Sequence, residues 1–588
     1  MKTYSQDHGL PPLPVPDLPA SCAAVAEIAA PLVDTEALDS LLADLNDFSR
    51  PGGAGELLQG MLTERALTVP GNESWLRPFW DDMYLAWREP LPINMNYFFR
   101  FDAQRWGGEK ALSRCVLALA RVLDSLASED LEPEQTKTGY LAMEQAASCL
   151  YTRIPCAGKD SLIRVSAVCA HISVVCCGHW FLLSLRNGEG EFVGEAALDR
   201  AFECIRKEAG QLPPALSLGA LSTAPREEAA KLRAVLLEGR QNRLSMASIE
   251  KTLFTVCLDP PYENADQAAL ALLGGDPANR FFDKSLQIIA SENGVLGANF
   301  EHAGCDAAIW VYLLSQADAL IMASANAPDK KSDDEQKLYR LLLWVVPMAV
   351  PGRLAAMRKD FQQRLQDVDI ACREMSDYGR DNLKSLGTSP DAFLQVAFQV
   401  AQHRIFGRLR SSYEAISARS FAQGRTECAR GSSGEALAFA LALQKGSPKS
   451  KLLEFYRQAE RIHKSRLQRC QRGLGIERHF YGLHAMWQIY GPLLGIEQEP
   501  ALFRNPAWQT LRHDALSTSG VGAPFIRFFG FGPVVPDGFG IGYAPEPGKT
   551  GLTVSSFRSS KLSASGFIDA FASAAGQIAT VLRNDNAI

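Results

Sequence analysis

A hairpin followed directly by a long apolar segment constrains the fold of this chain most strongly. Two β-rich runs, Ser285 to Ala290 and Val295 to Phe300, flank the dipeptide Asn293-Gly294. Asn-Gly tolerates the positive φ angles that a type I′ turn needs. The segment from Asp306 to Met322 comes immediately afterwards and is long and apolar, as in a buried helix. The pattern predicts a sheet packed against helices, with the junction between them as a place for functional residues.

The same alternation of strands and helices continues along the chain. Two short β-rich runs lie between His171 and Leu185, and a third lies between Thr252 and Leu258. The second half contains a well-marked helix start at Ser389-Pro390-Asp391, with a capping Ser, a Pro in the first turn and an acidic residue at the positive end of the helix dipole. Mixed strands and helices predict α/β or α+β layers in two lobes. Further strands are expected in the tail, at 525–529, 539–543 and 552–556.

Composition excludes several classes of protein. The 588 residues carry a net charge of −6, which argues against chain-wide affinity for nucleic acid but leaves room for a local basic pocket. No apolar run reaches about 18 residues, so no transmembrane segment is expected. The stretch from Met1 to Val15 lacks the apolar core of a signal peptide. The 13 cysteines include no C-x-x-C pair, so we predict reduced thiols, no metal site and a soluble, cytoplasmic protein.

Among the nine histidines, His302 stands at the junction between the predicted hairpin and the predicted helix. It begins an H-x-x-x-D pattern that ends at Asp306. A histidine can accept a proton from an alcohol near pH 7, and a carboxylate four residues later can orient the ring or hold a neighbouring cation. Taken alone, the pattern is weak, and a buried structural histidine is the commoner explanation of such a match.

The sequence around His302 resembles the carnitine/choline acyltransferase family. Members read N-R-W-F-D-K-x-L-Q, a short hairpin and then E-H-x-x-x-D/E-G. This chain reads N-R-F-F-D-K-S-L-Q from Asn279 to Gln287 and E-H-A-G-C-D from Glu301 to Asp306. The start L-P-P-L-P-V-P, the run from Thr252 to Asp259 and the C-terminal strands also look like that family, in family order.

This resemblance implies an α/β fold of two chloramphenicol-acetyltransferase-like lobes. Each lobe would be a mixed β-sheet flanked by helices, with an active-site tunnel at their interface. The predicted N-terminal lobe, 1–370, carries the catalytic His, and its first residues, to about 80, could pack on the other lobe. The predicted C-terminal lobe, 371–588, carries the contacts to CoA and carnitine.

The implied reaction is reversible transfer of an acyl group between CoA and the hydroxyl of L-carnitine, without an acyl-enzyme. His302 would be the general base, and Asp306 would steady a neighbouring Arg. Ser519, the last residue of an S-T-S motif, would donate a hydrogen bond to the oxyanion.

The resemblance also assigns the substrate contacts. CoA enters as a substrate and no cofactor is implied. Its 3′-phosphate would lie on two cations four residues apart, Arg380 and Lys384, and its adenosine end on Asp391. The carnitine carboxylate would be held by Tyr413, Thr426, Arg478 and Ser517, and the trimethylammonium would lie near Phe531. Thr426 and Arg478 favour carnitine over choline, because choline-using members replace this Arg by an uncharged residue.

The acyl pocket and two departures from the family pattern leave alternatives open. Phe529 occupies the position where a bulky residue selects short acyl chains, whereas Gly530 and the run from Asn94 to Tyr97 are more typical of longer-chain members. Ala307 and Gly520 replace the Gly and Gln of the family. They keep open an enzyme that uses choline or a polyol as acceptor, and a homologue that binds CoA esters without catalysis is the other alternative. We expect a monomer whose partners are acyl-CoA and L-carnitine, with no nucleic acid.

Overall fold

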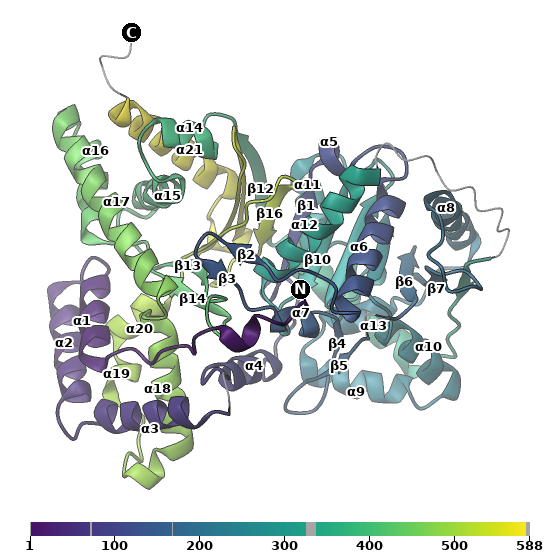
Figure 1. Ribbon diagram of the computed structural model, residues 1–588, viewed down its shortest axis with the longest axis horizontal. Helices are drawn as coiled ribbons and strands as arrows, with labels where there is room; N and C mark the ends of the chain where they lie inside the picture. Colours follow the sequence, from purple (N-terminus) through teal and green to yellow (C-terminus); the bar gives the residue numbers. More distant parts are fainter. Residues whose placement is uncertain (1, 71–72, 167, 325–336, 584–588) are drawn as a thin grey trace.

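The computed structural model describes residues 2–70, 73–166, 168–324 and 337–583 (Figure 1). Within them the strands form two large mixed sheets, each flanked by helices, as predicted. In sheet order, the first comprises β11 (Tyr339–Leu341), β7 (His179–Ser184), β6 (His171–Cys176), β8 (Thr255–Asp259), β9 (Leu286–Ser291), β10 (Leu296–Glu301), β1 (Asn96–Phe101) and β16 (Ile526–Phe531). The second comprises β12 (Val368–Met375), β18 (Thr550–Phe557), β17 (Phe539–Pro545), β15 (Leu516–Gly520), β13 (Ser412–Ser417) and β14 (Thr426–Ala429).

The predicted hairpin and its following helix are confirmed, but the turn differs from the prediction. Strands β9 and β10 pair antiparallel with Ala290 opposite Leu296, and α12 (Ala307–Ser324) follows. Within the turn Gly294 has φ +81°, whereas Asn293 keeps a negative φ, so the turn is not type I′. The Asn293 amide instead bonds across the loop, accepting from Ser291 Oγ at 2.7 Å and donating to the carbonyl of Tyr262 at 2.7 Å.

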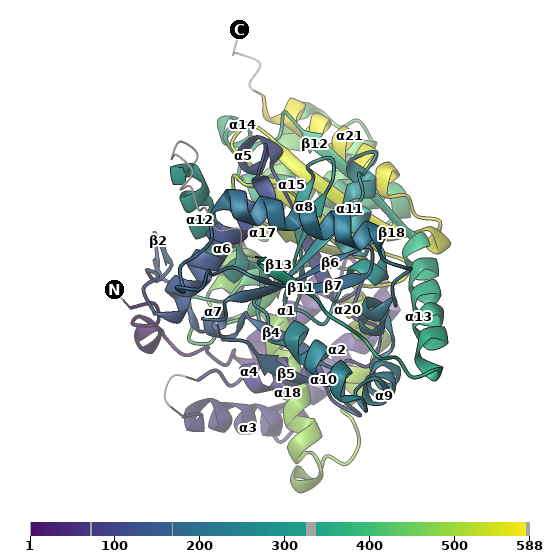
Figure 2. The same ribbon diagram turned by 90° about the vertical axis from the view of Figure 1, so that its right-hand side faces the viewer.

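Apolar side chains alternate along the strands of the first sheet, and helices cover both faces. Figure 2 views this lobe from the end where β6, β7 and β11 lie. One face packs against α5 (Ala103–Trp106), α6 (Ala111–Ala127), α7 (Glu144–Ser148), α8 (Glu195–Gln211) and α12. The other packs against α9 (Arg226–Leu236), α10 (Arg240–Glu250), α11 (Ala265–Leu273) and α13 (Ala349–Gln366). Short pairs join β2 (Gln135–Thr136) to β3 (Gly139–Tyr140) and β4 (Tyr151–Ile154) to β5 (Ser161–Arg164).

The second sheet and an N-terminal helical layer complete the molecule. The helices packed on this sheet are α14 (Arg380–Ser385), α15 (Pro390–Phe406), α16 (Gly434–Gln444), α17 (Lys449–Gln471) and α21 (Ala564–Leu582). A separate apolar cluster unites the early and late helices α1 (Leu18–Ala29), α2 (Thr35–Ser49), α3 (Ala54–Thr68), α4 (Arg77–Leu85), α18 (Ile476–Tyr490), α19 (Ala501–Arg504) and α20 (Pro506–Arg512). Among the described residues, every helix falls short of the length and apolarity that crossing a bilayer requires.

Strand β16 joins the two sheets. It comes from the C-terminal part of the chain, yet it pairs antiparallel with β1 at the edge of the first sheet. It also contacts β17 and β18 of the second sheet. Residue 370 itself lies within β12 of the second sheet, and β11, the strand before it in the chain, belongs to the first sheet. The division into lobes 1–370 and 371–588 stays a prediction, and β16 is the segment that crosses it.

Candidate active site

His302 lies directly after β10, at the point where the first sheet faces the second. Its side chain is 29 % exposed. The ring of Tyr84 stacks on the imidazole at 5.4 Å between centroids, and Tyr97 packs edge-on at 5.1 Å. Burial lowers the pKa of His302 below its usual 6.5, with Asp306 acting in the opposite direction. The imidazole is therefore neutral near pH 7 and able to accept a proton.

Asp306 holds an arginine, as the resemblance implied, and the structure identifies it as Arg425. The Nε of Arg425 donates to Asp306 Oδ2 at 2.9 Å, and the two Nη atoms donate to the carbonyls of Ala303 (3.2 Å) and His302 (3.3 Å). Burial alone would raise the pKa of Asp306, but Arg425 and His302 lower it overall. Asp306 Oδ1 lies 3.8 Å from His302 Nδ1, beyond hydrogen-bond distance. Asp306 thus acts mainly on Arg425, which joins the edge of the second sheet to the loop of His302.

A second buried network fixes the backbone on either side of His302, and sequence reasoning missed it. The Glu301 carboxylate accepts hydrogen bonds from the hydroxyl of Tyr151, from Nη1 of Arg153 at 3.0 Å and from the main-chain N–H of Ala303 at 2.9 Å. In the sequence, the only sign of this network is the adjacent pair Glu301-His302. Tyr151 and Arg153 lie 150 and 148 positions before Glu301 in the chain, so only the fold brings them here.

Three of the four residues predicted to hold a carboxylate, namely Arg478, Tyr413 and Thr426, meet around one guanidinium. Arg478, in the first turn of α18, donates from Nη2 to the hydroxyl of Tyr413 at 2.9 Å and to Thr426 Oγ1 at 3.3 Å. Its Nε donates to the carbonyl of Thr426 at 2.8 Å. The guanidinium also stacks over the ring of Trp80, 4.1 Å from the centroid. Within the described part of the chain, Nη1 has no hydrogen-bond partner.

Ser517 and Ser519 lie on the same face of β15, since side chains alternate along a strand. Ser517 stands opposite Tyr413 in the sheet register. It thus lies beside the set of Arg478, Tyr413 and Thr426, which we call the Arg478 group. Ser519 is partly buried next to Gly542 of β17, and its hydroxyl makes no hydrogen bond to any described residue. Neither serine bonds to His302 in the described residues, so the structure tests neither predicted role.

Phe529, predicted to line the acyl pocket, lies in a row of aromatic rings, the aromatic wall, which runs from β16 through Tyr97 to His302. Phe529 is 2 % exposed and packs against Tyr97 at 6.2 Å and Phe99 at 5.6 Å. Phe531, on the same strand face, lies 5.6 Å from Phe529. Gly530 points to the other face, where an added Cβ would lie 2.7 Å from the ring of Phe98. The missing side chain of Gly530 is thus compensated by Phe98 and leaves no open channel.

The predicted CoA contacts lie on two successive helices, α14 and α15. Arg380 and Lys384 are exposed on α14, one helical turn apart, so their side chains share a face. Asp391 instead lies at the start of α15, where it accepts from the hydroxyl of Tyr543 at 2.8 Å and lies 3.1 Å from His463 Nε2.

Asp391 also belongs to a cluster of two carboxyl groups and one imidazole. Among the described residues, Asp391, Glu414 and His463 are the group whose ligand atoms lie close enough together to hold a metal ion. The absence of a metal site stays a prediction.

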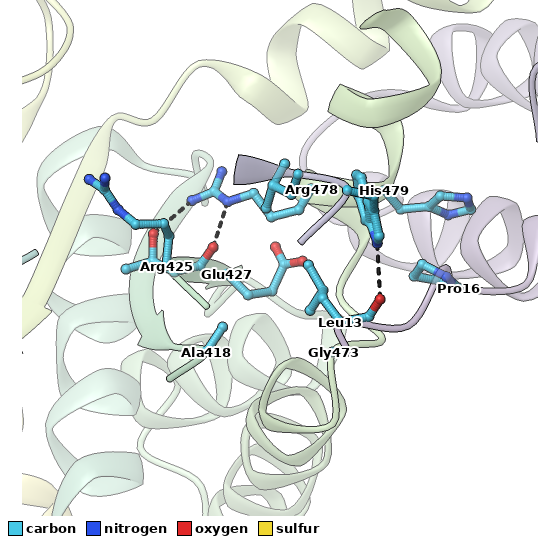
Figure 3. Close-up of a pocket in the computed structure, with 11 residues that line it drawn as sticks. Leu13, Pro16, Ala418, Arg425, Glu427, Gly473, Arg478 and His479 are labelled. Carbon is cyan, nitrogen blue, oxygen red and sulfur yellow. Dashed lines mark hydrogen bonds between the residues drawn. The ribbon is translucent and has the colours of Figure 1, made fainter. Parts of the chain in front are cut away.

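A pocket opens behind the Arg478 group (Figure 3). The polar side of the pocket consists of Arg425, Thr426, Glu427, Arg478 and His479. Leu13 near the N-terminus and Trp75 also line the pocket, and Trp75 Nε1 donates to the carbonyl of Leu13 at 3.1 Å. The remaining lining residues are Pro16, Leu76, Ala418 and Gly473.

Known proteins are similar to this chain over most of its length. The sequence model described as choline/carnitine O-acyltransferase matches residues 13–573. Human choline O-acetyltransferase is 31% identical over 95% of this chain and 77% of its own length. Rat carnitine O-acetyltransferase is 29% identical over 94% of this chain and 90% of its own length. Among solved structures, a trichothecene 15-O-acetyltransferase from Fusarium sporotrichioides is 10% identical with a TM-score of 0.41, covering 86% of this chain and 94% of that one. The family match spans nearly the whole chain, and the chain belongs to the choline/carnitine O-acyltransferase family.

Proposed function

We propose that the protein catalyses reversible transfer of a short acyl group between CoA and L-carnitine. Membership of the family establishes acyl transfer from CoA to a hydroxyl acceptor as the class of reaction. The choice of acceptor and of chain length goes further and is argued from this chain's own residues.

The Arg478 group is the observation that carries the choice of carnitine. A guanidinium, the hydroxyl of Tyr413 and the hydroxyl of Thr426 converge within hydrogen-bond distance of one another. Such a set suits a carboxylate, which accepts charge-assisted bonds from a guanidinium. Choline is a cation without a carboxylate, so it would give the partly buried guanidinium of Arg478 no anionic partner from the ligand. The relatives do not decide this point, because choline and carnitine acetyltransferases lie at 31% and 29% identity.

His302 supplies the general base in this proposal. Its Nδ1 is buried and has no hydrogen-bond partner in the described residues, so Nε2 is the nitrogen that takes the proton. The carnitine hydroxyl attacks the thioester carbonyl and gives its proton to Nε2. The tetrahedral intermediate then expels the CoA sulfur, which receives that proton. In the reverse direction the CoA thiol gives the proton to the same nitrogen.

The remaining predicted roles follow from placement around this step. Ser519 would donate to the oxyanion of the intermediate, and a single such donor contributes about 10²–10³ in rate. Phe529 limits the acyl chain, because its ring occupies the space next to Tyr97 and thereby next to His302. Arg380 and Lys384 offer two solvent-facing cations for the CoA 3′-phosphate, and Asp391 is the third predicted contact.

Thiol release from acyl-CoA, measured with and without L-carnitine, tests the proposal. We expect carnitine-dependent release that is fastest with acetyl-CoA and falls as the acyl chain lengthens. Release that depends on choline or a polyol but not on carnitine would refute the acceptor. No acceptor-dependent release with any acyl chain from about two to sixteen carbons would refute the proposal as a whole, given the rate enhancements typical of enzymes.

A further inference from the structure

A buried carboxyl group lies in the pocket behind Arg478 and has no part in the reaction proposed above. Glu427 follows Thr426 on β14, and its side chain lines the same pocket as Thr426 and Arg478 (Figure 3). The residue is only 5 % exposed. An ionisable group this deeply buried costs free energy unless it is paired or neutral, so its position calls for an explanation.

Glu427 is built into the first turn of the helix that carries Arg478. The main-chain N–H of Cys428 donates to its Oε1 at 2.7 Å. A Cβ at Gly475, the residue before α18, would lie 2.2 Å from the carboxyl carbon of Glu427. The glycine therefore makes room for the carboxyl group at the positive end of the helix dipole. The main-chain N–H of Arg478 likewise stabilises the ionised form.

The charges that face Glu427 come from two helices and its own strand. Arg478 and Glu477 lie on α18, Cys470 on α17 and Cys428 on β14. Glu477 is already paired, at 2.6 Å from Arg430 Nη2. Burial raises the pKa of Glu427 to about 7, and Arg478 is the cation that opposes this rise. Arg478 is therefore the cation whose charge Glu427 would share when it ionises.

We propose that Glu427 is a proton-linked specificity residue, which takes up a proton when an acceptor carboxylate binds to Arg478. This inference rests on the proposed function, since carnitine supplies the carboxylate. A carboxylate on Arg478 engages the charge that stabilises ionised Glu427 and adds a negative charge nearby. Both effects favour protonation of Glu427. The proton comes from solvent, and no covalent bond changes.

The linkage has a definite sign. Below pH 7 Glu427 is already neutral in the free protein, so carnitine affinity is independent of pH there. Above pH 7 binding must neutralise the carboxylate, and the affinity falls by up to about tenfold per pH unit. Glu427 thus acts through Arg478 as a positioning residue and does not touch the acceptor.

Calorimetric titration of the full-length protein with L-carnitine measures this proton directly. Titrations at pH 7.5 in two buffers of different ionisation enthalpy give the number of protons taken up per ligand. We expect an uptake of a substantial fraction of one proton in the wild type and none in Glu427→Gln. The matched control is Glu36→Gln, an exposed carboxylate in the first turn of α2, which should keep the wild-type uptake.

The outcomes separate the two proposals. Absence of carnitine binding to the wild type overturns the proposed function and this inference with it. Carnitine binding with equal proton uptake in the wild type and in Glu427→Gln overturns this inference alone. Should Glu427→Gln fail to fold, the wild type still decides, because a carnitine affinity that stays constant from pH 6.5 to 9 contradicts the linkage.

Discussion

At the scale of single residues, chemistry follows from burial and from the nearest charge. His302 is kept neutral by burial between Tyr84 and Tyr97. Arg478 keeps its charge because the Tyr413 hydroxyl, the Thr426 carbonyl and the nearby Glu427 carboxyl favour the protonated guanidinium. Burial and neighbouring charge together therefore keep His302 neutral and Arg478 positively charged.

Replacing His302 by Ala tests the base directly. Turnover should fall by more than about a hundredfold, since general-base catalysis contributes about 10²–10⁴ in rate. The KM for acyl-CoA should stay within a factor of about two, because no CoA contact is removed. Steady-state kinetics check both values. Residual activity above about a hundredth of wild type would contradict the base role.

Replacing Arg478 by Asn tests the carboxylate site. The KM for L-carnitine should rise by about 30-fold or more, because truncating one partner of a buried charge pair costs about 2–5 kcal/mol. Thiol release with choline as acceptor should fall much less or improve. The exposed Arg472, the residue after α17, offers a matched control. Arg472→Asn should leave unchanged both the KM for L-carnitine and thiol release with choline. An equal loss with both acceptors would argue against a carboxylate site.

At the scale of secondary-structure elements, strand alternation and helix ends position the site. Side chains on β16 alternate, so Phe529 faces the aromatic wall near His302 while Gly530 faces Phe98. On α18, the first turn places Arg478 at Thr426 and Glu427. A shift of one residue in either element would point a different side chain into the site.

Replacing Phe529 by Ala tests the acyl-chain limit. The enzyme should accept medium-chain acyl-CoA, with thiol release by octanoyl-CoA rising relative to acetyl-CoA. The variant also loses about 3–5 kcal/mol of stability, as large-to-small core substitutions do. Phe528→Ala is the matched control, because this neighbouring buried ring faces away from Phe529. An unchanged chain-length profile in Phe529→Ala, or an equal change in Phe528→Ala, would rule out Phe529 as the residue that limits the acyl chain.

At the scale of the whole molecule, the site exists only where the two sheets meet. Arg425 precedes β14 of the second sheet and bonds to the loop of His302 after the first sheet. Strand β16 crosses in the opposite direction and pairs with β1. These two connections hold the candidate base next to the acceptor residues.

Replacing Arg425 by Ala should weaken the junction between the lobes. Removing it leaves Asp306 buried without a partner, a loss of about 3–5 kcal/mol. Because Arg425 lowers the pKa of Asp306, the stability from this pair is present above the ordinary carboxyl pKa and is lost as pH falls through the folded value. Thermal unfolding followed by circular dichroism at pH 7 should show a lower Tm. Arg50→Ala, which removes an exposed pair with Asp47, should have little effect.

Local pattern was enough to predict the elements and the residue types of the chemistry. The hairpin, the helix after it and the His302–Asp306 pair can each be predicted from neighbouring residues, because hydrophobic periodicity and turn-forming residues are local features of a sequence. The resemblance named the Arg478 group, and these residues do meet. It did not reveal the Glu301 network, since Tyr151 and Arg153 are distant from Glu301 in sequence.

The sequence by itself determined the alternating strands and helices, the proposed base and the proposed cation for the acceptor carboxylate. The tertiary structure decided which charges face one another. It paired Asp306 with Arg425, left Nη1 of Arg478 without a described partner and buried Glu427 beside the first turn of α18. The physical reason is that burial and charge pairing depend on distance in space, and residues hundreds of positions apart come together only when both sheets are formed.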